Sequence, residues 1–219
     1  MMKKLLYLLI VPISLSLSSC TMMVKGLAKL VVKDYNDYTD TNISNVQVVD
    51  AKGKSQLFKE AFAGKTVYLY LWKNKNDKAF EQNENYLALQ KRFAKYPDVV
   101  FADLYLGNET VADSYTLGSN VNPQVLLDLL STSESAPFII GKDGSILSYK
   151  GPRPNDNTLV DFALYEARNG VNGTKAAKKL IRSVNGNKRF KTQEMRDWYT
   201  QHFNKVPDGS VNFSVSSVK

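Results

Sequence analysis

The stretch Thr66-Val-Tyr-Leu-Tyr-Leu-Trp72 decides how this chain folds. Its residues are β-branched, aromatic or leucine, and no charged or turn-forming residue interrupts them. Such a run is typical of a strand that is buried on both faces. We therefore predict a central β-strand at 66–72, with the rest of the domain arranged around it.

Strand and helix patterns alternate on both sides of this strand. An amphipathic helix follows it, for which Asn76 or Asp77 offers an N-cap and which ends near Tyr96-Pro97. The order of elements predicts an α/β fold whose sheet contains parallel and antiparallel pairs. The other predicted elements before residue 150 are a weak strand at 46–50, one short helical turn at 55–62, a buried strand at 99–106, a helix at 125–130 after Pro123, and a hairpin of strands 138–140 and 145–149. Those that follow are a helix from 156 or 157 to about 170, helices at about 174–184 and 193–203, the latter with Thr192 as cap, and an edge strand at 211–215.

The first twenty residues have the features of a targeting segment. Lys3 and Lys4 form a positive region, residues 5–17 form an apolar one, and Ser18-Ser19 precede Cys20. The apolar run is too short and too rich in serine to span a bilayer well. Small residues before a lone cysteine resemble the lipobox of bacterial lipoproteins. An ordinary signal peptide with a chance cysteine is the alternative.

The lipoprotein resemblance implies a covalent membrane anchor. Cleavage would precede Cys20, a diacylglycerol thioether would form on its sulfur, and an acyl chain such as palmitate would modify the new amino terminus. Two or more chains give a stable anchor. No acidic residue follows Cys20 closely, which in lipoproteins implies delivery to the outer membrane. We therefore expect a lipid-anchored protein of the bacterial envelope, on the periplasmic face of that membrane.

Four parts are expected along the chain: a signal peptide at 1–19, a tether at 20–44, an α/β domain at 45–170 and a basic helical extension at 171–219. Residues 173–219 hold ten basic and three acidic residues, a net charge of +7. The remainder of the chain from Cys20 holds 17 basic and 18 acidic residues, a net charge of −1. The basic block predicts contact with anionic headgroups, lipopolysaccharide or an acidic partner, or else a solvated helical face.

Several short motifs follow one another in a definite order over residues 46–169. They are Val48–Lys54, Gly64-Lys65, the strand that ends in Leu71-Trp72, Pro137 before Phe138–Ile140, and Lys142-Asp143-Gly144 in the hairpin. Together they resemble membrane-anchored thioredoxin-like proteins of the redoxin type. The resemblance implies a thioredoxin-like central mixed sheet flanked by helices. It also implies a Cys-x-x-Cys pair at a helix start and a cis-proline, for which Pro137 is the match.

The redox pair of that family is missing here. The family pattern, laid on this chain from Trp72, places the two cysteine positions at Asn76 and Ala79. Disulfide exchange requires a thiolate and a second, resolving thiol, and neither residue provides one. With Cys20 lipidated, no free thiol would remain. We therefore predict no thiol-dependent catalysis, no catalytic residues, and no cofactor besides the lipid on Cys20.

Other catalytic or metal centres are not predicted either. His202 is the only histidine, and it lies beside Phe203 in a predicted helix. We predict a structural role for it, at the surface or half-buried, rather than a role as a base. No cluster of His, Cys, Asp and Glu has the spacing of a metal site.

The surroundings of the two positions where the family has cysteines predict a binding surface instead. Lysines crowd the segment where the predicted helix begins, and a helix N-terminus also favours anions. The family resemblance implies that the backbone before Pro137 pairs with a substrate peptide as an added strand. A degenerate site, with solvated lysines and a proline kept for folding, is the alternative. The residues of this predicted surface are Trp72, Lys73, Lys75, Lys78, Ser135, Ala136 and Pro137.

We therefore expect a redox-inactive, thioredoxin-like lipoprotein that binds a peptide or protein, or acts as a scaffold, in the bacterial envelope. Two alternatives stay open: a redoxin-related enzyme that acts on disulfides, and a structural subunit of an envelope complex. The expected partners are the lipid bilayer through the anchor, an envelope protein or peptide, and an anionic surface contacted by residues 173–219. Nucleic acid is not expected, given the predicted location.

Overall fold

The computed structural model describes residues 40–74, 78–107, 109, 111–149, 153–209 and 211, with only the backbone of Lys78 and Ala79. The predicted signal peptide, Cys20 and most of the tether lie outside the described residues. So do Lys75, Asn76 and nearly all of the tail strand predicted at 211–215. The elements are β1 (Gln47–Val49), β2 (Ser55–Leu57), α2 (Phe58–Ala61), β3 (Thr66–Trp72), the 3₁₀ helix η1 (Lys78–Gln82), α3 (Glu84–Phe93), β4 (Val99–Tyr105), β5 (Tyr115–Leu117), α4 (Gln124–Leu130), β6 (Ser135–Ile140), β7 (Ile146–Ser148), the 3₁₀ helix η2 (Pro154–Asp156), α5 (Thr158–Ala167), α6 (Gly173–Arg182) and α7 (Gln193–Phe203).

The strands form one mixed sheet in the order β2-β1-β5-β4-β3-β6-β7. β3 is a central strand, as predicted, and every one of its residues is buried. It runs parallel to β4 and antiparallel to β6. Because side chains alternate along a strand, its aromatic and aliphatic residues face opposite sides of the sheet. The aromatic set is Tyr68, Tyr70 and Trp72, and the aliphatic set is Val67, Leu69 and Leu71.

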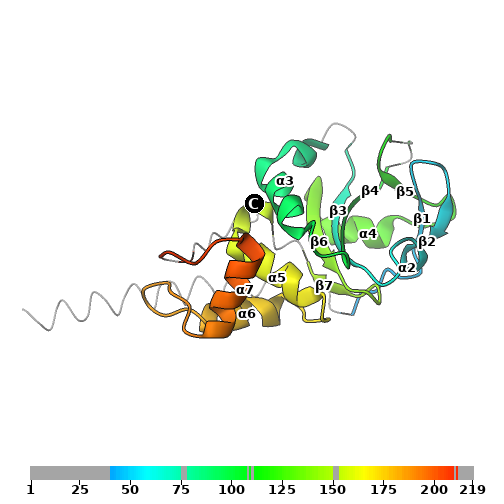
Figure 1. Ribbon diagram of the computed structural model, residues 1–219. Coiled ribbons are helices and arrows are strands. Elements are labelled where there is room, and N and C mark those ends of the chain that lie inside the picture. The colour runs from blue at the N-terminus through cyan, green and yellow to red at the C-terminus, as the bar shows by residue number, and fades with distance from the viewer. Residues whose placement is uncertain are drawn as a thin grey trace, which may run out of the picture.

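Helices cover both faces of the sheet (Figure 1). α3 and α5 pack on the aromatic face of β3, whereas α2 and α4 pack on the aliphatic face. α6 and α7 belong to the same hydrophobic cluster as α5 and lie outside it. As a result, Tyr165 is the only residue of α5 that is not buried. A helix that is covered on all sides is expected to be apolar nearly all round, as this one is.

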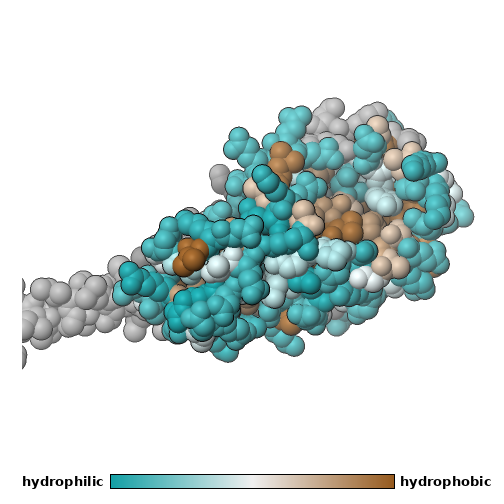
Figure 2. Space-filling model, in the orientation of Figure 1, coloured by the Kyte–Doolittle hydropathy of each residue, from teal (hydrophilic) through white to brown (hydrophobic). Residues whose placement is uncertain are grey.

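The outer surface of the C-terminal helices is hydrophilic in Figure 2. Among the described residues, no helix combines the length and the apolar character that crossing a bilayer requires.

The structure confirms several predicted elements and corrects others. The strand at 66–72 and the helix at 193–203 have the predicted bounds, and Thr192 caps that helix through its side chain. The segment 55–62 is not one helical turn but β2 followed by α2. The strand β5 was not predicted; it is three residues long and half-buried.

The helix after β3 begins later than predicted. The Oδ1 atom of Asn83 accepts hydrogen bonds from the backbone N–H groups of Asn85 (2.9 Å) and Tyr86 (3.3 Å). Asn83 is therefore the N-cap of α3, and the assignment of Asn76 or Asp77 to that role was wrong. The 3₁₀ helix η1 occupies the residues before it.

The expected cis-proline was also wrong. No peptide bond among the described residues is cis, so the Ala136–Pro137 bond is trans. Pro137 lies within β6, opposite Tyr70 of β3. Pairing of β6 with β7 is confined to Ile139 and Ile140. Pro137 therefore lies beyond that pairing, at a position where a strand tolerates a residue without an N–H group.

Candidate functional site

The end of β3 brings together those predicted binding residues that the structure describes. Trp72 lies opposite Ser135 in the β3–β6 ladder, and Ala136 and Pro137 follow along β6. Trp72, Ala136 and Pro137 are buried, whereas Ser135 is half-buried. The buried residues shape this end of the sheet, and Ser135 is one of the few predicted residues that a partner could contact.

Lys73 continues the chain from Trp72 and is held against the residue before β6. Its backbone N–H donates to the carbonyl of Glu134 (3.1 Å), and its Nζ lies 3.5 Å from Glu134 Oε1. The Lys73 side chain is 29% exposed, so it too can contact a partner. Lys78 and Ala79 are the first two residues of η1, and the predicted grouping of their side chains with Lys75 and Asn76 stays a prediction.

An aromatic cluster covers the aromatic face at this end of β3. The ring of Phe80, from η1, stacks on Tyr70 with the centroids 4.1 Å apart and the planes 2° apart. Phe80 also meets Trp72 edge-on at 6.3 Å. Tyr86 of α3 contacts both Tyr70 (5.6 Å) and Phe80 (5.9 Å) edge-on. These geometries are the favourable ones for aromatic pairs, and they hold η1 across the sheet.

A buried carboxylate lies beneath this cluster. Asp103 of β4 is 8% exposed, and its Oδ2 accepts a hydrogen bond from Trp72 Nε1 (3.0 Å). Tyr105, on the same face of β4, packs against the Trp72 ring at 4.6 Å. Sequence reasoning missed Asp103, although one acid in the otherwise apolar run Val-Val-Phe-Ala-Asp-Leu-Tyr-Leu (99–106) was a visible signal.

The phenols of the cluster are neutral at physiological pH. Burial raises the pKa of Tyr86 well above its usual value, and the charge of Asp103 raises it further. Burial likewise raises the pKa of Tyr70, against an opposing effect of the Arg153 charge. The cluster thus presents neutral rings and one hydrogen-bonded carboxylate. Across the residues that the structure covers, no three His, Cys, Asp or Glu side chains are grouped as metal ligands.

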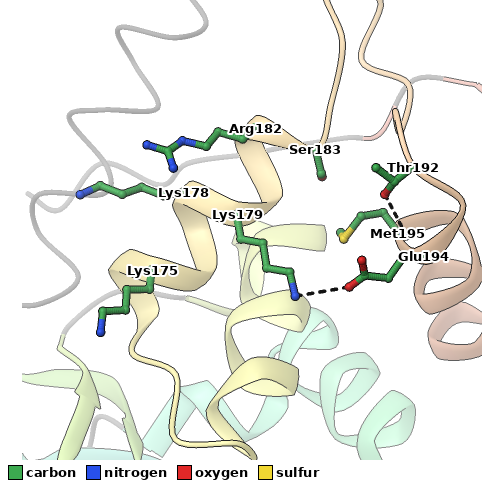
Figure 3. A pocket seen from close by; sticks show the side chains of 8 residues that line it. All are labelled: Lys175, Lys178, Lys179, Arg182, Ser183, Thr192, Glu194 and Met195. Atoms are coloured by element: carbon green, nitrogen blue, oxygen red, sulfur yellow. Dashed lines mark hydrogen bonds and ion pairs between the residues drawn. The ribbon is translucent and has the colours of Figure 1, made fainter.

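A second feature, a groove of about 480 Å³, lies between α6 and the start of α7 (Figure 3). Figure 1 shows α6 at the other end of the molecule from η1. Sequence reasoning did not predict the groove, because it depends on how the two helices are packed. Its lining residues are Lys175, Lys178, Lys179, Arg182, Ser183, Thr192, Glu194 and Met195.

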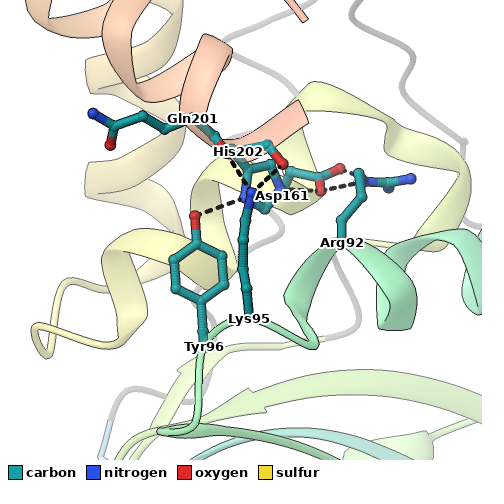
Figure 4. Close-up of polar contacts among 6 residues, drawn as sticks. All are labelled: Arg92, Lys95, Tyr96, Asp161, Gln201 and His202. Carbon is teal, nitrogen blue, oxygen red and sulfur yellow. Dashed lines mark hydrogen bonds and ion pairs between the residues drawn. The ribbon is translucent and has the colours of Figure 1, made fainter. Parts of the chain in front are cut away.

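A third polar cluster surrounds His202 in the interior (Figure 4). His202 Nε2 lies 2.6 Å from Asp161 Oδ1, and the hydroxyl of Tyr96 lies 3.1 Å from His202 Nδ1. Arg92 donates to both carboxylate oxygens of Asp161, from Nε (2.6 Å) and Nη2 (2.8 Å). His202 is 1% exposed, so the surface or half-buried position predicted for it was wrong. Its contacts join α3, α5 and α7, which is a structural role.

Comparison with known proteins bears on the fold. The sequence matches no protein-family model and no curated protein. Among solved structures, the chain resembles the thioredoxin domain of a thiol-disulfide oxidoreductase from Bacteroides vulgatus, with 16% identity, 57% of this chain and 96% of that chain covered, and a TM-score of 0.40. It also resembles BsSco, a member of the Sco family of cytochrome c oxidase assembly proteins, with 13% identity, coverage of 62% and 98%, and a TM-score of 0.41.

The topology of the sheet decides the fold class. β3 and β4 are parallel and joined through α3, and β6 and β7 add antiparallel strands on the other side of β3. α3 and α5 lie on one face and α4 on the other. The fold is thioredoxin-like. At such low identities, the likeness to these solved structures concerns the fold alone.

Proposed function

We propose that this protein is a membrane-anchored, redox-inactive thioredoxin-like lipoprotein that binds a protein or peptide in the bacterial envelope. The observation that carries the proposal is the cysteine content, because Cys20 is the only cysteine among 219 residues. A dithiol site needs two thiols, and one of them must be ionised near neutral pH. With the one cysteine of the chain in a lipoprotein-like processing site, the thioredoxin-like domain would have no thiol.

The packing at the end of β3 supports a role without redox chemistry. In a redox site, the positive N-terminal end of a helix lowers the pKa of the attacking thiol. Here α3 begins at Glu84, and Asn83 is its N-cap. Phe80 and the rest of η1 precede that start. The helix terminus is thus displaced along the chain from Asn76 and Ala79, the positions that match the cysteines of the family pattern.

The exposed part of the same region is the proposed binding surface. Lys73 and Ser135 are both half-buried. Lys73 directly follows β3 and Ser135 begins the adjacent strand β6, with Glu134 beside Lys73. An extended peptide at this surface would meet charge of both signs and the backbone of β6, which are features that peptide-binding edges use. The buried aromatic cluster beneath would keep the surface rigid.

A disulfide-reduction assay separates this proposal from an enzyme that acts on disulfides. The chain from residue 20 is purified with Cys20 and with Cys20→Ser, and both proteins are offered a disulfide substrate together with a reductant. We expect no turnover above the uncatalysed rate for either protein. Turnover that survives Cys20→Ser would overturn the redox-inactive assignment.

Fractionation of cells tests the anchor. The wild-type protein should be recovered with the outer membrane, and Cys20→Ser should move it to the soluble fraction. Mass spectrometry of the processed amino terminus should show the diacylglycerol on Cys20. An unmodified, reactive Cys20 thiol in the processed protein would contradict the proposal.

Site-specific photo-crosslinking tests the binding surface. A photoreactive residue at Ser135 should give a discrete adduct in cells, whereas the same residue at the exposed position Lys54 should not. Lys73→Glu should reduce the Ser135 adduct, because it reverses the charge beside the surface. An equal adduct from both positions would rule out binding at the end of β3. Recovery of the protein only within a large complex in mild detergent would instead favour the structural-subunit alternative.

A further inference from the structure

The outward face of α6 is a row of cations. Lys175, Lys178, Lys179 and Arg182 follow a spacing of three and four residues, which places them on one side of a helix. All four are exposed. The surface over α6 is correspondingly hydrophilic (Figure 2). These four residues are among the ten basic residues that give 173–219 its net charge of +7.

The inward face of α6 is fully used in the core. Its buried residues are Gly173, Ala176, Ala177 and Leu180. At the first of these, an added Cβ would lie 2.4 Å from Ser148 Oγ, so α6 is seated tightly on β7. The helix therefore keeps no apolar side with which to insert into a membrane or a partner. Whatever its outward face binds must be recognised by charge.

One of the four cations is already neutralised. Lys179 Nζ lies 3.2 Å from Glu166 Oε1 and 3.5 Å from Glu194 Oε1. Figure 3 shows Lys179 pointing toward α7, whereas Lys175, Lys178 and Arg182 point away from it to a common side. Among the described residues, these three side chains have no ion pair. We call Lys175, Lys178 and Arg182 the α6 cation row.

The tether that leads from Cys20 enters the fold beside this helix. Asn42 forms an isolated antiparallel β-bridge with Ser145, and the N–H of Ile146 donates a hydrogen bond to the carbonyl of Thr41 (3.2 Å). The chain therefore arrives at the start of β7. Gly173 of α6 packs against Ser148, the last residue of the same strand. Nineteen residues lie between Cys20 and Asp40. The twenty steps from one to the other span at most about 70 Å when the chain is fully extended. A bilayer that holds Cys20 is thus within reach of α6.

We propose that the α6 cation row lies against the anionic, phosphate-bearing surface of the bilayer to which the chain is anchored. This inference rests on the proposed lipid anchor, which brings the bilayer to the cation row. Each basic residue near an anionic membrane strengthens binding about five-fold, so three give about 100-fold. An increment of this size is sufficient to orient a protein that is already tethered, and in an untethered protein it is measurable as a preference for anionic over neutral vesicles. The other end of the molecule, with Lys73 and Ser135, would then face away from the lipid.

Vesicle binding tests the cation row without the anchor. The chain from residue 20 with Cys20→Ser, which keeps every described residue, is titrated with vesicles of pure phosphatidylcholine and of equal parts phosphatidylcholine and phosphatidylglycerol. We expect about 100-fold tighter binding to the anionic vesicles, and loss of that preference as salt is raised. The triple variant Lys175→Gln/Lys178→Gln/Arg182→Gln should bind both vesicles alike.

A second triple variant provides the matched control. Lys52→Gln/Lys54→Gln/Lys91→Gln removes the same charge from exposed positions on the β1–β2 turn and on α3. It should keep the preference for anionic vesicles, and all three proteins should melt at the same temperature because the substituted side chains are exposed. The proposal would be overturned if the two triple variants lost the preference for anionic vesicles equally, or if the parent protein showed no such preference. An unchanged preference in the α6 triple variant would also overturn it.

The assay also separates the two proposals. The titrated protein carries no lipid, so a negative result leaves the fractionation and disulfide-reduction experiments unaffected. The chain could show no preference for anionic vesicles, while an envelope protein crosslinks to the wild-type protein and not to the α6 triple variant. The partner of the α6 cation row would then be an acidic protein, and the membrane proposal would be wrong.

Discussion

His202 Nε2 lies 2.6 Å from Asp161 Oδ1, and neither side chain is exposed to solvent. Arg92 and Tyr96 complete the hydrogen bonding of the pair from α3 and the segment after it. The His202 ring also stacks on Trp198 at 5.6 Å. Buried ionisable groups are tolerated where each finds partners, and these four residues satisfy one another. The network fixes α7 to α3 and α5 in a single arrangement.

Removing the carboxylate of this network should destabilise the protein strongly. Asp161→Ala leaves the Arg92 guanidinium and the His202 imidazole without their shared acceptor. We expect a loss of about 3–5 kcal/mol in the free energy of unfolding, measured by urea denaturation at neutral pH. Asp197→Ala, at an exposed position of α7, is the control and should change stability by about 0.5 kcal/mol or less. Similar losses in the two variants would mean that the buried network contributes nothing particular.

The start of α3 can be tested at its cap. Asn83→Ala removes the side-chain acceptor for two backbone N–H groups and should cost about 1 kcal/mol of unfolding free energy. Asn83→Ser keeps a capping oxygen and should retain most of that stability. If alanine and serine are equivalent in thermal and urea unfolding, Asn83 is not the cap.

The aromatic cluster makes a prediction that fluorescence can follow. Phe80→Ala removes the ring that stacks on Tyr70 and meets Trp72, and it should cost about 3 kcal/mol. Because the chain has two tryptophans, the substitution is made in a Trp198→Phe background so that emission reports on Trp72. We expect a shift of that emission to longer wavelength as water reaches the ring. Leu87→Ala, at a residue of α3 that is 49% exposed, should leave both readouts nearly unchanged.

Asp98 should make stability depend on acid pH. Burial alone would raise the pKa of Asp98, but hydrogen bonds from Arg168 (2.9 Å) and Lys142 (3.2 Å) outweigh it and lower the pKa below 3.8. The ionised form is therefore favoured in the folded state. Its contribution is complete above the unfolded-state pKa near 3.8 and is lost as pH falls through the lower folded-state pKa.

The measurement compares the wild-type protein with Asp98→Asn in urea unfolding from neutral pH down to about pH 2. The wild-type protein should be the more stable of the two at neutral pH, and the difference should vanish toward the acid end. Asp113→Asn, which removes a carboxylate at an exposed position, is the matched control. A gap between wild type and Asp98→Asn that is constant with pH would contradict the role of the Asp98 charge.

Local patterns in the sequence predicted the central strand, the second buried strand and the C-terminal helix because those elements carry their own periodicity or apolar run. The start of α3 was missed because Asn76, Asp77 and Asn83 are all suitable caps, and the choice depends on how Phe80 packs against β3. β5 was missed because three half-buried residues become a strand only through pairing with β1 and β4.

In the candidate site, too, local features could be predicted from the sequence and features that depend on packing could not. The absence of a redox pair could be read directly from a sequence with one cysteine. The burial of Ala136 and Pro137 could not, because it depends on how the rest of the fold covers β6. Asp161 and His202 are 41 residues apart in the chain, and only the packing of α7 on α5 brings them together.

Helix α5 has an apolar surface on its outer as well as its inner side, since α6 and α7 cover it. A shortened protein that ended near Gly170 would lack both of these covering helices. The apolar outer side of α5 would then be exposed to water. It would then need a substitute cover, from a second copy or from an aggregate. The last fifth of the chain therefore covers the hydrophobic core. Any partner that binds or displaces it would change the stability of the whole protein.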